Sequence, residues 1–157
     1  MKHELSKILE KASKLCEDGK YTQALKYYEN ILRIESDNVA VIIDCGVTLQ
    51  NLGLHRKALK MYDLALTIQP KNLDALINKG SVLHTSQKYS EAISCYNIVL
   101  SLDKKNTMAI AYKGLSVGEM GNIPSAIKYF KKALSIDNDY GLAQISLDTA
   151  KRIMKSH

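Results

Sequence analysis

Tryptophan is absent from this 157-residue sequence, phenylalanine occurs once, and there are only two prolines and three cysteines. No apolar run approaches the length that crosses a bilayer, and the charged N-terminal stretch MKHELSKILEKASKL lacks the apolar segment of a signal peptide. Cys16, Cys45 and Cys95 are odd in number, widely spaced and outside any CxxC pair, which disfavours a disulfide framework. These absences favour a cytoplasmic protein with reduced thiols.

Motifs of catalysis are missing as well. The sequence contains no glycine-rich phosphate loop, no HExxH and no GxSxG. We therefore expect no enzyme activity, no catalytic residues and no cofactor. The formal net charge is +6, but the basic residues are dispersed and no run of Lys or Arg exceeds two. This dispersion is typical of a solvated surface and disfavours nucleic acid as the main partner.

Four columns of residues recur with a period of 34. They hold Ala24, Ala58, Ala92 and Ala126; Ala12, Gly46, Gly80 and Gly114; Gly19, Gly53, Gln87 and Gly121; and the aromatic residues Tyr28, Tyr62, Tyr96 and Phe130. A fixed period of this length indicates a stack of supersecondary units rather than one central core. We number the positions of each repeat from residues 5, 39, 73 and 107.

Each repeat reads as two helices with apolar residues at helical spacing. The expected helices cover 5–18, 21–35, 39–52, 55–69, 73–86, 89–103, 107–120 and 123–136, and an amphipathic helix follows at 142–155. Glycine at three of the four turns within repeats suits a left-handed backbone. Gln87 occupies the fourth turn, where the same conformation costs about 1 kcal/mol and predicts a weak joint. No segment alternates with period two, so no strand is expected.

These helical pairs, with Gly or Ala at positions 8 and 20 and an aromatic residue at position 24, resemble the tetratricopeptide repeat family. The resemblance implies an all-α, right-handed α-solenoid of four repeats (5–38, 39–72, 73–106 and 107–140) with a capping helix at 141–155. The resemblance covers about 5–138 directly, and we expect residues 1–157 to form a single domain. One departure is position 4, often Trp in the family, which holds Ile8, Ile42, Leu76 and Ile110.

The resemblance also implies a concave groove lined by the first helix of each repeat, which binds peptides or partner helices. By position, the expected groove residues are Leu9, Ser13, Cys16, Ile43, Val47, Gln50, Asn51, Asp74, Ile77, Ser81, His84, Met108, Ala111, Leu115 and Glu119. Position 5 is apolar in every repeat, and we expect these side chains to be exposed. An exposed apolar stripe is typical of a binding surface. The sequence therefore favours a protein-interaction scaffold for an apolar or amphipathic partner segment.

Two alternatives stay open. The groove could be filled by the chain's own terminal helix or by another copy, which would make a homo-oligomer. The second helices of the repeats carry basic residues that could bind RNA or an acidic partner: Arg56, Lys57, Lys60, Lys128, Lys131 and Lys132. Because Tyr28, Tyr62, Tyr89 and Tyr96 occupy core positions, a stacking platform for RNA has little support.

Two further kinds of site are disfavoured. Some members of the family grip a chaperone's C-terminal carboxylate with Lys at position 5 and Asn at position 9, where this chain has Leu9 and Ser13, or Ile43 and Val47. We expect no such clamp. Cys16 and His84 share position 12 but lie two repeats apart, too far to share a metal ion because neighbouring helices are about 8–10 Å apart.

Overall fold

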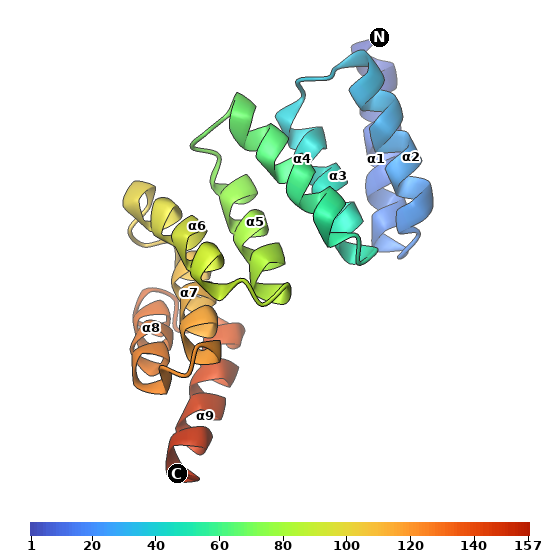
Figure 1. The fold of residues 1–157 in the computed structure, drawn as a ribbon. Helices are drawn as coiled ribbons and strands as arrows, with labels where there is room; N and C mark the ends of the chain where they lie inside the picture. The colour runs from blue at the N-terminus through green and yellow to red at the C-terminus, as the bar shows by residue number, and fades with distance from the viewer. The chain divides into compact units, whose positions relative to one another are not determined.

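The computed structural model describes all 157 residues as nine α-helices joined by short turns, with no strand (Figure 1). The helices are α1 (Lys2–Glu17), α2 (Tyr21–Ile34), α3 (Val39–Asn51), α4 (His55–Ile68), α5 (Leu73–Thr85), α6 (Tyr89–Leu102), α7 (Thr107–Glu119), α8 (Ile123–Ile136) and α9 (Gly141–Lys155). The expected all-α class and the eight repeat helices are confirmed. None of the nine is long and apolar enough to span a bilayer.

The chain divides into two compact units, Met1–Val82 and Leu83–His157, which we call the N-terminal and C-terminal units. The boundary falls inside α5, near its C-terminal end. In the N-terminal unit, α2 packs on α1, and α3 packs on both α2 and α4. In the C-terminal unit, α7 packs on α6 and α8, and α9 packs on α8 and α7. The single domain expected from the sequence stays a prediction.

Close approach of the paired helices explains the glycine column at position 8. A Cβ atom built on Gly46 would lie 2.6 Å from Cε1 of Tyr62, and one on Gly114 would lie 2.8 Å from Cε1 of Phe130. Both aromatic rings are buried, as is Ala92 in the position-20 column. Small residues therefore stand where helices touch, and large apolar side chains fill the remaining core.

The turns within repeats use a left-handed residue. Gly19, Gly53 and Gly121 have φ of 73°, 75° and 92°, and Gln87 takes the same conformation with φ of 61°. The expected conformation of Gln87 is confirmed. Because its Cβ crowds the backbone there, this turn is strained in a way that the other three are not.

The turns between repeats are fixed by an asparagine at position 34, just before the next helix. The side chains of Asn38, Asn72 and Asn106 accept hydrogen bonds from backbone N–H groups three residues ahead, at 3.2, 3.0 and 2.9 Å. Each of these bonds caps the N-terminus of a helix that begins a repeat. Tyr140 takes this position before α9 and makes no such side-chain bond.

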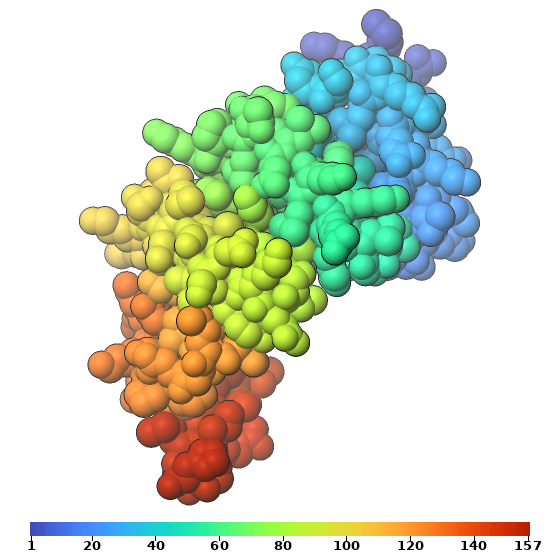
Figure 2. All heavy atoms as spheres, viewed as in Figure 1, coloured from blue at the N-terminus to red at the C-terminus, as the bar shows by residue number.

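The first and last helices differ from the helices between them. α1 begins at Lys2 rather than at residue 5, because its polar first turn carries Glu4, which suits a helix N-terminus, although it adds nothing to the apolar pattern. α9 buries Ala143, Leu147 and Ala150 against α7 and α8. Most of its other residues are exposed, and the helix is the red segment in the space-filling view (Figure 2).

Candidate functional site

The predicted groove residues differ in how much surface they leave open. Ser13, Asn51, Asp74, Met108 and Glu119 are exposed, while Leu9, Cys16, Val47, Gln50, Ser81, His84 and Leu115 are half-buried. Ile43, Ile77 and Ala111 are only 8%, 6% and 0% exposed. The expected exposure of position 5 is therefore wrong in the last three repeats. Ile43 and Ala111 belong to the apolar cores of their units, so their side chains stabilise the stack and offer little surface to a partner.

The side chains at position 12 of the first two repeats form hydrogen bonds within the N-terminal unit. The hydroxyl of Tyr62 donates to Oε1 of Gln50 at 2.9 Å, and Nε2 of Gln50 donates to Oγ of Ser81 at 3.4 Å. In the first repeat, Sγ of Cys16 lies 3.6 Å from Oγ1 of Thr48, which is a buried polar side chain. The contacts of Cys16 and Gln50 thus link position 12 to the next repeat, and the bond from Tyr62 gives its buried hydroxyl a partner.

His84 makes the equivalent link in the C-terminal unit. Its Nδ1 lies 2.8 Å from the hydroxyl oxygen of Ser116, which is fully buried, and its ring packs edge-on against Tyr89. Burial lowers the pKa of His84, and the nearby carboxylate of Glu119 partly offsets this. The neutral imidazole is thus favoured beside Ser116. His84 has a structural partner, and no group of three or more His, Cys, Asp or Glu residues is gathered for a metal ion.

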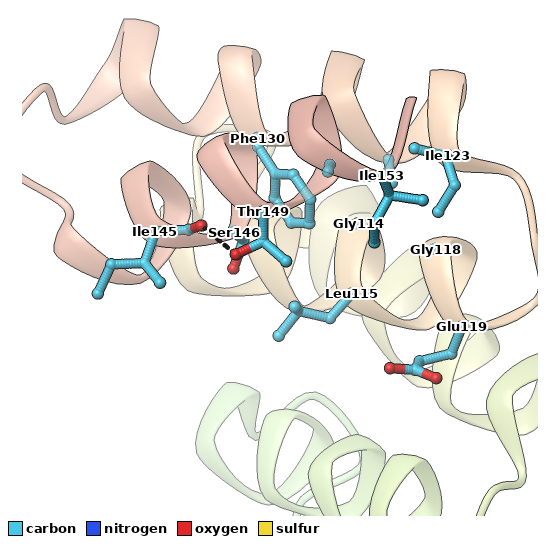
Figure 3. Close-up of a pocket in the computed structure, with 12 residues that line it drawn as sticks. Gly114, Leu115, Gly118, Glu119, Ile123, Phe130, Ile145, Ser146, Thr149 and Ile153 are labelled. Atoms are coloured by element: carbon cyan, nitrogen blue, oxygen red, sulfur yellow. Dashed lines mark hydrogen bonds between the residues drawn. The ribbon is translucent and has the colours of Figure 1, made fainter. Parts of the chain in front are cut away.

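An apolar hollow of about 280 Å³ opens between α7, α8 and α9, and we call it the α7–α9 hollow. Its lining includes Leu115, Phe130 and Ile123 together with Ile145, Thr149 and Ile153 of α9. Figure 3 shows Leu115, Phe130 and Thr149 around the same space, with Ile123 and Ile153 on one side and Ile145 on the other. The hydroxyl of Thr149 donates to the Ile145 carbonyl at 2.9 Å and accepts from the guanidinium of Arg152 at 3.5 Å.

The hollow exists because the fourth repeat departs from the others at two positions. Position 12 is Gly118, where the earlier repeats have Cys16, Gln50 and His84, and position 24 is Phe130, where they have Tyr. Gly118 has no side chain to occupy the space, and Phe130 has no hydroxyl that needs a partner. Both residues line the hollow. The polar contact that closes this place in the second repeat is therefore replaced by open apolar surface.

Two of the predicted groove residues, Leu115 and Glu119, line the α7–α9 hollow. The contribution of α9 to the lining was missed, because this helix was interpreted as a cap or as a segment that could fill the groove. Continuing the 34-residue count places Ile145, Thr149 and Ile153 at positions 5, 9 and 13, which are groove positions. That count is the signal that could have found them. Ile145 is 67% exposed, unlike its buried counterpart Ala111.

The residues that line the α7–α9 hollow are almost all uncharged. Glu119 is the single charged residue among those that line it, and it forms no ion pair. The carboxylate is exposed at the end of α7, beside the apolar lining. An apolar lining with one convergent charged group is the usual composition of a binding site. This arrangement can hold an apolar side chain of a ligand, and Glu119 can pair with a cation of the same ligand and so orient it.

Solved structures share this fold at low sequence identity. The MamA protein superposes with a TM-score of 0.79 at 21% identity, over 97% of this chain and 83% of that one. A tetratricopeptide repeat protein from Parabacteroides merdae ATCC 43184 gives a TM-score of 0.80 at 21% identity, over 97% of this chain and 60% of that one. The first tetratricopeptide repeat domain of Spaghetti, bound to the HSP90 peptide SRMEEVD, gives 0.70 at 19% identity, over 74% and 93%.

A comparison with curated proteins found no match. The family profile described as the tetratricopeptide repeat matches residues 45–72, 73–106 and 113–140, which is more than half of the chain. These segments lie within the second, third and fourth repeats defined by the residue columns. Such repeats indicate a protein–protein interaction scaffold. The chain belongs to the tetratricopeptide repeat family.

Proposed function

We propose that the protein is a non-catalytic scaffold whose α7–α9 hollow holds an apolar segment of a partner protein. The observation that carries this proposal is the open apolar lining around Gly118 and Phe130, beside the unpaired carboxylate of Glu119. The partner that fits best places an apolar side chain in the hollow and a Lys or Arg next to Glu119. Its segment is thus amphipathic and basic.

The physical advantage of this site is that its surface is already formed. Leu115 and Phe130 are held by helices α7 and α8, and α9 packs against both of these helices. A rigid surface loses little conformational entropy on binding, so more of the gain from apolar burial remains as affinity. Glu119 also favours one orientation of the bound segment, because a Lys or Arg of that segment placed away from Glu119 would lose water without gaining a partner.

Three fluorescent peptides test the proposal by anisotropy. Each places leucines on one helical face, and the opposite face carries lysines, glutamines or glutamates. We expect the Leu/Lys peptide to bind most tightly. Gly118→Gln/Phe130→Tyr should weaken it roughly tenfold or more, because this pair copies Gln50 and Tyr62 and fills the hollow. Circular dichroism should show an unchanged fold.

The control is Glu119→Gln, which keeps the shape of the hollow but removes its charge. It should weaken the Leu/Lys peptide and leave the Leu/Gln peptide unaffected. Equal binding of the Leu/Lys peptide by the wild type and the filled variant would refute the proposal. Light scattering over a concentration series identifies another outcome: an oligomer that dissociates in the filled variant would mean that a second copy occupies the hollow, which would overturn the partner-protein proposal.

A further inference from the structure

A second hollow lies in the N-terminal unit. It opens between α2 and α4 over α3, has a volume of about 400 Å³, and we call it the α2–α4 hollow. Its floor is formed by Leu25, Leu32, Cys45, Leu49 and Met61. Nothing in the groove prediction pointed here, because all its lining positions lie outside positions 2, 5, 9, 12 and 13.

The α2–α4 hollow is open because the second repeat departs from the first and fourth repeats at positions 7 and 23; the third repeat has Lys79 and Cys95 at these positions. In the fourth repeat, Nζ of Lys113 lies over the Tyr129 ring, 4.9 Å from its centroid. The first repeat has the same arrangement, with Lys at position 7 and Tyr at position 23, at 5.1 Å. The second repeat has Cys45 and Met61 instead. A short thiol and a flexible thioether leave uncovered the space that the Lys–Tyr pair closes.

The same departure removes a charge partner. Lys79, at position 7 of the third repeat, forms an ion pair of 2.7 Å with Asp63 at position 25 of the second. One repeat earlier, the corresponding residues are Cys45 and Glu29, and both line the hollow. Burial raises the pKa of the Cys45 thiol to about 11, with smaller contributions from Glu29 and Asp44. The floor therefore stays uncharged at neutral pH.

Three cations surround this apolar floor. Arg33 extends from α2, and Lys57 and Lys60 extend from α4. All three are exposed, and none forms an ion pair; Arg33 only donates to the side-chain oxygen of Asn30, at 3.3 Å. Glu29 is the one acidic residue in the lining, so the rim carries a net positive charge. An anion placed here would meet cations that have no competing carboxylate partner.

We propose that the α2–α4 hollow is a second binding site, which takes an acidic amphipathic segment of a partner protein. An apolar side chain of that segment lies on the leucine and methionine floor. Its carboxylates pair with Lys57, Lys60 and Arg33. The charge of the rim selects this occupant over the basic segment expected at the α7–α9 hollow, because like charges would repel it.

The lining argues for a peptide rather than a nucleic acid. Sequence-tolerant binding of single strands depends on aromatic side chains that stack on bases. The α2–α4 hollow contains no aromatic residue, and its floor is built from leucine side chains, Met61 and Cys45. Apolar side chains of a peptide gain free energy on such a surface, whereas phosphates would use only its rim.

The Leu/Glu peptide tests this site, with Lys57→Glu/Lys60→Glu as the disrupting variant. Lys128→Glu/Lys131→Glu is the matched control, because it makes the same charge change on exposed lysines of α8. We expect roughly tenfold weaker binding of the Leu/Glu peptide in the first variant and little change in the control. A shape test is Cys45→Lys/Met61→Tyr, which copies the fourth repeat, closes the hollow and should also weaken binding.

Several outcomes would overturn the proposal. Equal weakening by both charge reversals would mean that net charge alone attracts the peptide. Equal binding of an acidic peptide without leucines would remove the role of the floor, and tighter binding of a single-stranded RNA would assign the face to nucleic acid. Unchanged binding of the Leu/Lys peptide by Lys57→Glu/Lys60→Glu keeps this test separate from that of the α7–α9 hollow, so either proposal can fail alone.

Discussion

The α2–α4 hollow and the α7–α9 hollow arise in the same repeat fold by different substitutions. The first opens where Cys45 and Met61 replace a lysine that covers a tyrosine, and the second opens where Gly118 and Phe130 replace a polar pair. The first lies between the second helices of two successive repeats, over α3, and the second lies between α7 and α8 of one repeat and α9. Three cations surround the first, and a single carboxylate stands beside the second.

In this repeat stack, a hollow opens where a contact made in another repeat is lost. In the second repeat, the hydrogen bond between Gln50 and Tyr62 fills the space at position 12. Cys45 and Met61 leave the α2–α4 hollow at position 7. The fourth repeat shows the reverse. Lys113 lies over the Tyr129 ring at position 7, and Gly118 leaves the α7–α9 hollow at position 12. The backbone is shared, so the difference lies in side-chain volume and hydrogen bonding.

Ala92→Leu tests the 34-residue register that the repeats share, and we expect it to have the largest effect. Ala92 is fully buried at position 20 of α6, so three added heavy atoms have no space. Overpacking should lower the free energy of unfolding by roughly 1–3 kcal/mol or more. Urea denaturation measures this change, and Ser94→Leu, at an exposed site on the same helix, is the control. Unchanged stability of Ala92→Leu would refute the register.

Two glycines of equivalent helices should respond to alanine in opposite directions. Gly46→Ala would place a Cβ 2.6 Å from the buried Tyr62 ring, so it should cost roughly 1–3 kcal/mol of stability. Gly118→Ala would place its Cβ 3.4 Å from that of Ala126, an ordinary contact. It should add about 0.5–1 kcal/mol through helix propensity. Thermal unfolding followed by circular dichroism measures both, and a similar loss in the two variants would mean that the α7–α9 hollow is not open at Gly118.

Tyr62→Phe breaks the bond that closes position 12 in the second repeat. Gln50 loses its donor at 2.9 Å, so the variant should lose about 0.5–1.5 kcal/mol of stability. In the fourth repeat, Phe130→Tyr adds a hydroxyl that has no partner, and Gly118→Gln should supply one. A double-mutant cycle by urea denaturation should therefore show favourable coupling between these two substitutions. Strict additivity would contradict the equivalence of the two positions.

The smallest expected effect is a pH dependence that comes from His84. Burial lowers its pKa below the value of about 6.5 in the unfolded chain, so below that pH the unfolded state binds more protons than the folded state. Stability should therefore decrease as the pH falls from neutral through this range. His84→Gln should reduce that slope, as measured by urea denaturation at several pH values. An unchanged slope would mean that His84 does not make its bond to Ser116 as a neutral ring.

Most of the fold was predictable because its determinants are local and repeated. Helical spacing, the turn glycines and the small residues at positions 8 and 20 recur four times, so a chance pattern was excluded. Even the left-handed backbone of Gln87 followed from its place in the glycine column, since turn geometry is set by the neighbouring helices. The asparagine caps at position 34 were also within reach of the sequence, because Asn is a favoured N-cap residue.

Less of the candidate site was predictable. Leu115 and Glu119 were among the expected groove residues, whereas Ile43 and Ala111, expected to be exposed, are buried. The exposure of a side chain depends on how far it reaches between helices, and this cannot be predicted from its position in the repeat alone. The part played by Ile145 was missed because α9 was interpreted as a cap, although it continues the groove positions beyond the fourth repeat.

Nine helices, their order and the contacts that recur between paired helices follow from the residues alone, because they depend on periodicity and on residue size at fixed spacing. Where that packing leaves a gap is visible only in the folded chain. Each hollow depends on two residues twelve to sixteen positions apart, such as Gly118 with Phe130 or Cys45 with Met61, which meet across a helical pair. A gap is a property of volumes summed in space, so a column of single residues does not reveal it.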